Sequence, residues 1–142
     1  MELGDWLGVC IADINLGNLA LAQNDFDLAE KQGVKVILDL QERAEVLGID
    51  GALDVLASLA ASRGEIRRAA RIWGGVEGYR EARGIPWPPD EREMIEPRID
   101  AARTRLDRAA WEEEWERGRS MTLDQTVYYA LEGAGDRAQW SR

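Results

Sequence analysis

One motif of small and aliphatic residues occurs twice in this chain, and its two copies lie 40 positions apart. The first copy spans residues 16–29, and the second, more divergent copy spans residues 56–69. Matched positions are Leu16 and Leu56, Ala20 and Ala60, Phe26 and Ile66, and Ala29 and Ala69. A fixed period of about 20 to 50 residues is typical of stacked helical hairpins, because each repeat buries its apolar face against the next. The repeat therefore predicts a binding scaffold, a class that serves many different partners.

The composition fits one compact, largely helical domain of 142 residues, of which 45% are hydrophobic and 32% charged. Chains of this size bury roughly 68 to 70% of the surface that the unfolded chain exposes, so neither a disulfide nor a metal is needed for folding. The single cysteine, Cys10, stands between Val9 and Ile11 and is typical of a small core residue. We expect a cytoplasmic protein without membrane association, because apolar runs of about 18 residues and a signal peptide are both lacking.

The charge balance excludes several functions. With 27 acidic and 18 basic residues the net charge is -9, which repels phosphate backbones and predicts no direct binding to nucleic acid. Histidine, the commonest general base and nitrogen ligand of metals, does not occur in the sequence. No pair of nucleophile and base stands out either. We therefore expect a protein that is not an enzyme and that has no catalytic residues, metal site or cofactor.

Apolar residues recur at helical spacing along almost the whole chain, and no long segment alternates as a half-buried strand does. This predicts an all-α fold in which a hairpin at 1–48 and a second at 49–84 stack as a short right-handed superhelix. The turn at Asn24 and Asp25 separates the first two helices, and Asp25 or Asn24 caps the second. Gly48 is expected to end the second helix in a left-handed conformation, and the fourth helix ends near Arg83.

The prolines in residues 84–90 interrupt the repeat, so residues 85–134 are predicted to form a helical cap on the open end of the stack, followed by a tail at 135–142. The first helix of the cap spans about 89–106, with a kink or break near Glu93 because Pro97 lacks an N–H. The next helix stops at Gly118. Thr122 and Gln125 form a capping box for a last helix at 123–132.

Several side-chain clusters have both a structural and a functional interpretation. The three glycines Gly74, Gly75 and Gly78 lie inside a helical pattern, which favours close approach of a neighbouring helix over a phosphate-binding loop. The arginines at 63, 67 and 71 share a helix face that would suit a partner's carboxylate, yet an ordinary solvated surface explains them better. The acidic cluster at 112–116 is likewise interpreted as a solvated face, since it lacks the pattern of a calcium loop.

Aromatic residues offer a second candidate site. Trp6, Trp73, Trp111 and Trp115 all occupy apolar stripe positions, so a core role is the simpler interpretation. Trp87 lies between two prolines and is expected to pack the linker onto the hairpins, the alternative being an exposed anchor. A small-molecule sensor would use a pocket lined by Trp73, Tyr79 and Trp87.

Residues 16–36 and 56–76 resemble tetratricopeptide repeats, with a period longer than the usual one of about 34 residues. The matching positions are Leu16, Gly17, Ala20, Phe26, Ala29 and Val36, and then Leu56, Ala57, Ala60, Gly64, Ile66, Ala69 and Val76. Residues 69–74, 85–89, 111–115 and 118–125 resemble the C-terminal end of large bacterial signalling ATPases and transcriptional activators of the MalT-like or AfsR-like kind. The resemblance implies the C-terminal sensor or interaction part of such a regulator.

In tetratricopeptide arrays the first helix of each hairpin lines a concave groove that binds a protein or peptide. By register, this resemblance places nine residues in the groove: Ile11, Ile14, Asn15, Asn18, Ala22, Asp54, Val55, Ser58 and Ser62. The amides of Asn15 and Asn18 suit a peptide backbone, although they also suit neighbouring groups within the stack. The lysines typical of grooves that clamp a free C-terminal carboxylate do not occupy these positions. A third alternative is that the array mainly forms a homodimer.

Overall fold

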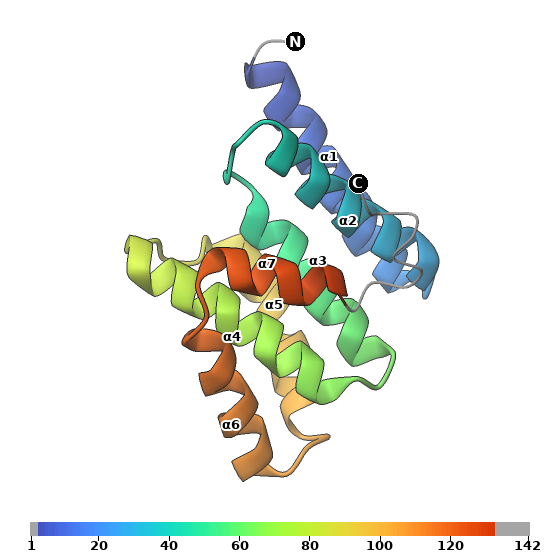
Figure 1. The fold of residues 1–142 in the computed structure, drawn as a ribbon. Coiled ribbons are helices and arrows are strands. Elements are labelled where there is room, and N and C mark those ends of the chain that lie inside the picture. The colour runs from blue at the N-terminus through green and yellow to red at the C-terminus, as the bar shows by residue number, and fades with distance from the viewer. Residues whose placement is uncertain (1–2, 133–142) are drawn as a thin grey trace.

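The computed structural model describes residues 3–132, and this part of the chain forms seven α-helices and no strand (Figure 1). The all-α fold predicted from the sequence is confirmed, whereas the right-handed superhelix stays a prediction. The expected tail at 135–142 and the end of the cap lie outside the described residues. The helices are α1 (Leu3–Ala22), α2 (Phe26–Glu42), α3 (Ile49–Ser62), α4 (Ile66–Arg83), α5 (Pro89–Arg103), α6 (Arg108–Arg119) and α7 (Leu123–Glu132).

The 40-residue period of the sequence recurs in the backbone of the first four helices. Asn24 and Gly64 follow α1 and α3 with φ angles of 59° and 85°, and Ala44 and Gly84 follow α2 and α4 with 53° and 64°. Next to the first pair, the N–H groups of residues 25 and 65 donate over 2.8 Å to the carbonyls of residues 20 and 60. Such left-handed C-terminal turns satisfy the last carbonyls of a helix. The α1–α2 and α3–α4 hairpins are thus structural copies of each other.

Local capping residues explain most helix ends. The Asp25 carboxylate accepts a hydrogen bond from the N–H of Leu28 over 3.3 Å, as predicted. At α7, the predicted capping box is confirmed: the Thr122 N–H donates to Gln125 Oε1 over 2.8 Å, and the Gln125 N–H donates to Thr122 Oγ1 over 3.1 Å. These side chains satisfy N–H groups that have no partner inside the helix.

Three predicted helix ends were wrong. The second helix ends at Glu42 instead of at Gly48, and Gly48 precedes α3 as its N-cap with a φ angle of 98°. The fifth helix ends at Arg103 instead of near residue 106, and it continues through Pro97 without a break, so that only the alternative of a kink near Glu93 stays a prediction. The sixth helix continues past Gly118, which lies inside the contact with α4.

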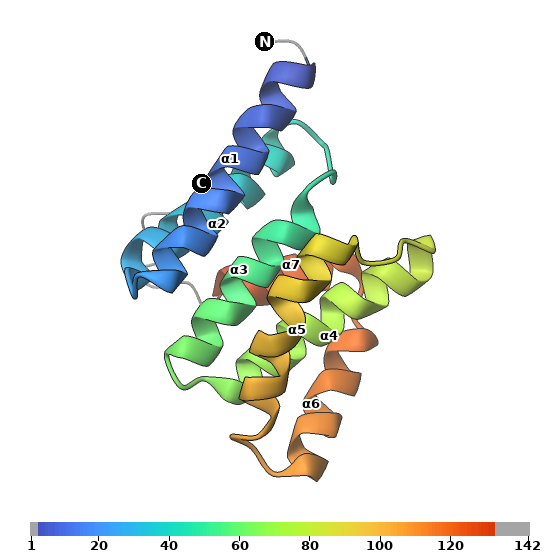
Figure 2. The ribbon, with the colours of Figure 1, turned by 180° about the vertical axis from the view of Figure 1, so that it is seen from behind.

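The α3–α4 hairpin forms the centre of the molecule. On one side α7 packs against α3 and α4 (Figure 1), and on the other side α5 packs against the same two helices (Figure 2). The α1–α2 hairpin stacks on α3 at one end of the molecule, and α6 covers α4 at the other. Since α5 and α6 separate instead of pairing, the segment after Gly84 does not form a third hairpin of the same kind.

Glycines allow the backbones of α4 and α6 to come into direct contact. A methyl group at Gly74 would overlap the carbonyl of Trp115, and one at Gly118 would overlap the carbonyl of Arg71. Gly78 faces the carbonyl of Arg119 in the same way. Small residues spaced by four positions permit this close crossing of two helices. The predicted close approach of a neighbouring helix at these glycines is therefore confirmed.

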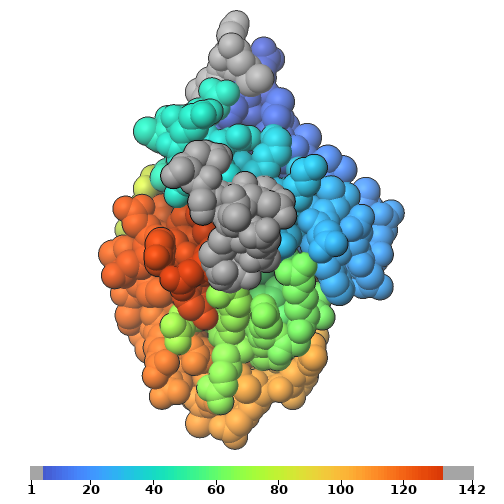
Figure 3. Space-filling model, turned by 45° about the vertical axis from the view of Figure 1, so that its right-hand side comes forward, coloured from blue at the N-terminus to red at the C-terminus, as the bar shows by residue number. Residues whose placement is uncertain are grey.

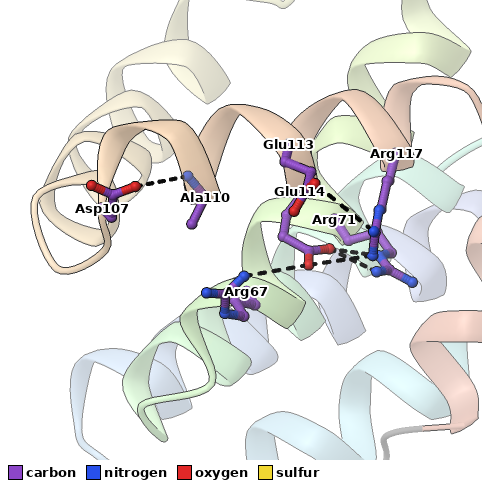
Figure 4. Close-up of polar contacts among 7 residues, drawn as sticks. All are labelled: Arg67, Arg71, Asp107, Ala110, Glu113, Glu114 and Arg117. Carbon is purple, nitrogen blue, oxygen red and sulfur yellow. Dashed lines mark hydrogen bonds and ion pairs between the residues drawn. The ribbon is translucent and has the colours of Figure 1, made fainter.

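A charged pair crosses the same helix contact. The guanidinium of Arg71 donates from Nε and Nη2 to Glu114 Oε1 over 2.9 and 2.7 Å, and Arg67 and Arg117 lie within 3.8 Å of the other oxygen (Figure 4). Glu114 is only 5% exposed. The interpretation of the arginine row and the acidic cluster as solvated faces is therefore wrong at these positions, because α6 packs its acidic side onto α4.

The core runs through all seven helices. Trp6, Trp73 and Trp111 are buried in it and Trp115 packs against it, as the stripe positions predicted. Cys10 is also buried, and burial together with the carboxylate of Asp13 raises the pKa of its thiol. In the space-filling view, α6 and α7 form one continuous surface with α4 (Figure 3). None of the described helices is long and apolar enough to cross a membrane.

Candidate functional site

The predicted groove residues fall into three groups according to their burial. Asp54, Val55 and Ser58 of α3 are buried, and the half-buried residues are Ile14 and Asn18 of α1. The exposed members are Ile11, Asn15, Ala22 and Ser62. Ser58 lies beneath α5, which packs on α3, whereas Val55 faces Gly17 of α1 and Gly33 of α2. The face predicted to receive a partner is thus partly covered by a later helix of the same chain.

Arg98 holds α5 in this position. Its Nη1 donates to Asn18 Oδ1 over 2.9 Å and to Ser58 Oγ over 3.1 Å, so one guanidinium nitrogen joins α1 and α3. These two polar groups occupy equivalent positions of the two repeats, 40 residues apart. The amide of Asn18 therefore accepts a hydrogen bond from Arg98 of the same chain. Of the two predicted roles, binding a peptide backbone or binding neighbouring groups within the stack, this is the second.

A cleft of about 410 Å³ remains between the ends of α1 and α3 and the second half of α5. It brings together the predicted residues Ala22, Ser58 and Ser62. The other lining residues are Leu21, Ala61, Arg98, Ala101, Ala102 and Arg105. This volume lies near the lower end of the range of about 300 to 1,000 Å³ typical of ligand sites. The cleft combines a floor of small apolar side chains with Arg98 of α5 and Arg105 of the turn after α5, and is the candidate site.

The two arginines could not be assigned to the site from sequence, because nothing local indicates that α5 covers the groove. The only relevant signal is their spacing: Arg98 and Arg105 are seven positions apart, which places them on one side of the helix predicted at 89–106. In the structure α5 ends at Arg103, and Arg105 lies in the turn that follows it. Arg105 donates from Nη1 to the carbonyl of Ala61 over 3.1 Å. Both side chains are therefore tied to the edges of the cleft that they line.

A buried carboxyl group lies behind the cleft. Asp54 is 4% exposed, and its Oδ1 has no hydrogen-bond partner. Burial raises the pKa of Asp54 well above its ordinary value, and the carboxylate of Asp50 raises it further, while Arg80 and Arg98 act in the opposite direction. In the same region, burial lowers the pKa of Arg98. Removing charged groups from water without a close partner disfavours their charged forms.

Arg80 organises a second charged cluster, which fixes the proline-rich linker. Its guanidinium is 3% exposed and pairs with Asp50 and with Glu91, and it donates to the carbonyl of Pro86 over 3.3 Å. Its carbon atom Cζ lies 5.5 Å from the ring centroid of Trp87. The linker is therefore packed back onto the hairpins through Trp87, as predicted.

The three residues of the predicted aromatic pocket do not share one cavity. Trp73 is buried in the core with 1% exposure, and Tyr79 is half-buried against the core and stacks with Arg83. Only Trp87 lines the groove of about 800 Å³ between α4, the linker and α5, and Trp115 lines its far side. Buried Trp73 therefore fills core volume instead of facing a ligand.

Among residues 3–132, no group of three or more histidine, cysteine or acidic side chains is arranged to hold a metal ion. Comparison with protein families, curated proteins and solved structures gave no match. The cleft is lined by small apolar side chains, two hydroxyl groups and two guanidinium groups.

Proposed function

We propose that this chain is a non-enzymatic module that binds a protein or peptide, and that the cleft between α1, α3 and α5 is its binding site. The observation that carries the proposal is that three residues predicted to face a peptide, Ala22, Ser58 and Ser62, line the same cleft in the structure. Its small side chains leave room for a peptide backbone to approach, and its hydroxyl and guanidinium groups offer hydrogen bonds.

A wider context follows from the resemblance of the repeats and of residues 85–125 to regulators of the MalT-like and AfsR-like kind. We propose that the chain serves as the C-terminal sensor or interaction part of a bacterial transcriptional or signalling regulator in the cytoplasm. The support for this is the likeness of those motifs together with the 40-residue period of the backbone turns. An ATPase encoded in frame upstream would support this context.

The binding site is tested by selecting peptides from a random display library on the immobilised chain. We expect enriched peptides to bind the unmodified chain and to bind at least about tenfold more weakly to Ser62→Trp, which fills the cleft. Ser62 suits the test because it is exposed, whereas Ser58 is buried and a bulky residue there would disturb the core. Ala82→Trp, at an exposed position of α4 away from the cleft, is the control. Unchanged binding by Ser62→Trp would contradict the assignment.

A second candidate function, homodimerisation, is favoured by the outer face of α1. Four large apolar side chains are exposed there: Val9 at 43%, Ile11 at 51%, Leu16 at 43% and Leu19 at 53%. Between Asp5 and the end of α1 the only charged residue is Asp13, which bonds to Lys35 over 2.6 Å and leaves the outer face uncharged. Two copies of a chain with a net charge of -9 can approach closely only where carboxylates are lacking.

Spacing along α1 agrees with pairing to a second helix. Gly8, Ala12, Asn15, Leu19 and Ala22 follow one another at intervals of four and three residues, the seam of a two-helix contact. Light scattering should then give about 32 kDa, twice the 15.9 kDa of one chain. Leu19→Glu should restore the monomer, and Tyr128→Glu, at another exposed apolar position on α7, should not. A monomer at high protein concentration would exclude this function.

A further inference from the structure

We infer that the cleft between α1, α3 and α5 selects carboxylates, and that it takes a short acidic peptide segment whose side-chain carboxylates are bound by Arg98 and Arg105. This inference rests on the proposed peptide-binding function of the same cleft and names the chemistry of its ligand. The arginines that bind the ligand come from α5 and from the turn after it, which both follow the repeats. A free peptide C-terminus is not required.

The first argument is that these two arginines lack the partners that every other described arginine has. No carboxylate of the described residues lies within 4.0 Å of the guanidinium of Arg98 or of Arg105. The other described arginines either pair with a carboxylate or stack on an aromatic ring. Those that stack without pairing with a carboxylate are Arg43 on Trp6, Arg68 on Tyr129 and Arg83 on Tyr79, and Arg68 also donates to the carbonyls of Tyr129 and Ala130. Two unpaired cations in one cleft stand out in a chain with 27 acidic and 18 basic residues.

The second argument is that Arg98 is held in place with one edge of its guanidinium unused. Both of its hydrogen bonds, to Asn18 and to Ser58, leave from Nη1. An arginine has five N–H donors, and the three on Nε and Nη2 form an edge that matches both oxygens of a carboxylate. Because Asn18 and Ser58 are neutral, they orient the guanidinium without compensating its charge. Asp54 acts on Arg98 only from beyond ion-pair distance, so a carboxylate of the ligand supplies the close counter-charge.

The third argument concerns spacing. Arg98 lies in α5, and Arg105 lies in the turn that continues this helix, where its N–H donates to the carbonyl of Ala102 over 3.0 Å. Seven residues at a rise close to that of a helix separate them by about 10 Å. Side chains of an extended peptide that point the same way are two residues, or about 7 Å, apart. The flexible arginine and glutamate side chains bridge the difference, so two acidic residues separated by one other residue fit the pair. Ala101 and Ala102 between the arginines leave space for the peptide backbone.

The net charge of the chain limits the ligand further. At -9 the molecule repels a long acidic tract, so the attraction of the two arginines acts only at short range. The best ligand therefore carries two carboxylates and is otherwise neutral. Such a ligand also leaves the apolar floor of the cleft in contact with uncharged parts of the peptide.

The test compares three probes by NMR, following the side-chain Nε–H signals of Arg98 and Arg105. The first is an acetylated and amidated peptide of sequence Gly-Ala-Glu-Ala-Glu-Ala-Gly, the second has glutamine in place of both glutamates, and the third is glutarate. We expect the acidic peptide to shift both signals in a saturable way and to bind about tenfold more tightly than the neutral peptide. Arg105→Gln, at an exposed position, should weaken binding of the acidic peptide at least about tenfold, and Arg98→Gln should do the same.

Arg83→Gln removes the same charge at an unpaired arginine outside the cleft, and it should bind the acidic peptide as the unmodified chain does. If both peptides shift the signals of residues lining the cleft with equal affinity, the selectivity for carboxylates is wrong while peptide binding stands. If glutarate binds and neither peptide does, the carboxylate site stands and the proposed peptide function is contradicted. If no probe shifts the arginine signals at millimolar concentration, the inference is overturned.

Discussion

Ala44 and Gly84 occupy the same backbone position in the two repeats, with φ angles of 53° and 64° after α2 and α4. In the first repeat the N–H of Glu45 donates to the carbonyl of Leu40 over 3.0 Å, and in the second the N–H of Ile85 donates to the carbonyl of Arg80 over 2.9 Å. The second repeat thus has glycine where the left-handed conformation is unstrained, and the first repeat has alanine, whose Cβ makes that conformation costly.

We therefore predict that Ala44→Gly stabilises the chain by about 1 kcal/mol and that Gly84→Ala destabilises it by about the same amount. No atom lies within 4 Å of a Cβ added at Gly84, so the second change tests the backbone alone. Urea unfolding followed by circular dichroism gives both values. A loss of stability in Ala44→Gly would show that the turn after α2 is not strained.

The same pair shows what sequence reasoning can and cannot predict. Gly84 marks the end of α4 at the predicted place, because glycine is the usual residue for a left-handed turn. Ala44 gives no such signal, so the sequence predicts a second helix that continues as far as Gly48. The difference arises because a favourable tertiary structure imposes a conformation that the residue itself does not prefer.

The candidate site was predictable only in part, for a related reason. The register of the repeat selected Ala22, Ser58 and Ser62, which do line the cleft. The contribution of α5 was not predictable, since the hydrogen bond from Arg98 to Asn18 joins residues 80 positions apart. Helical periodicity predicts which face of a helix is buried, but not which later helix will cover it.

Contact between α4 and α6 depends on glycine at position 118. We predict that Gly118→Ala costs about 3 kcal/mol, because its methyl group would overlap the Arg71 carbonyl and backbone cannot move aside as a side chain can. Gly8→Ala in α1 is the matched control. There a Cβ meets no atom within 4 Å, and alanine should add about 0.5 to 1 kcal/mol of stability. Similar melting temperatures for the two variants would argue against close contact of these backbones.

The charge of Glu114 is predicted to stabilise the same helix contact. Glu114→Gln leaves the Arg71 guanidinium without its carboxylate at a site where the Glu114 side chain is 7% exposed, and should cost about 3 kcal/mol in the free energy of unfolding. Glu112→Gln breaks the ion pair between Glu112 and Arg108, both on α6. Their side chains are 63% and 90% exposed, so this change should alter stability by less than about 0.5 kcal/mol. Equal effects in chemical denaturation would mean that burial of Glu114 does not matter.

The buried carboxyl group of Asp54 should make stability depend on pH in a defined direction. Its pKa is raised well above the unfolded-state value of 3.8, first by burial and then by Asp50, against the attraction of Arg80 and Arg98. The folded chain therefore binds its proton more tightly than the unfolded chain does. The contribution of Asp54 to stability is fully present below pH 3.8 and is lost as the pH rises from there through the folded-state pKa.

Asp54→Asn removes this titration while keeping the shape of the side chain. Relative to the unmodified chain, the variant should be more stable at pH 7, by about 1 to 3 kcal/mol, because no charge is then buried without a close partner. The advantage should shrink as the pH falls and should be lost below pH 3.8, where Asp54 becomes protonated in both states. Denaturant unfolding at several pH values measures the difference directly, and Asp100→Asn on the exposed face of α5 serves as control. If the two proteins differ in the free energy of unfolding by the same amount at every pH, then Asp54 has the same pKa in the folded and unfolded states. That result would contradict the effect expected from its burial.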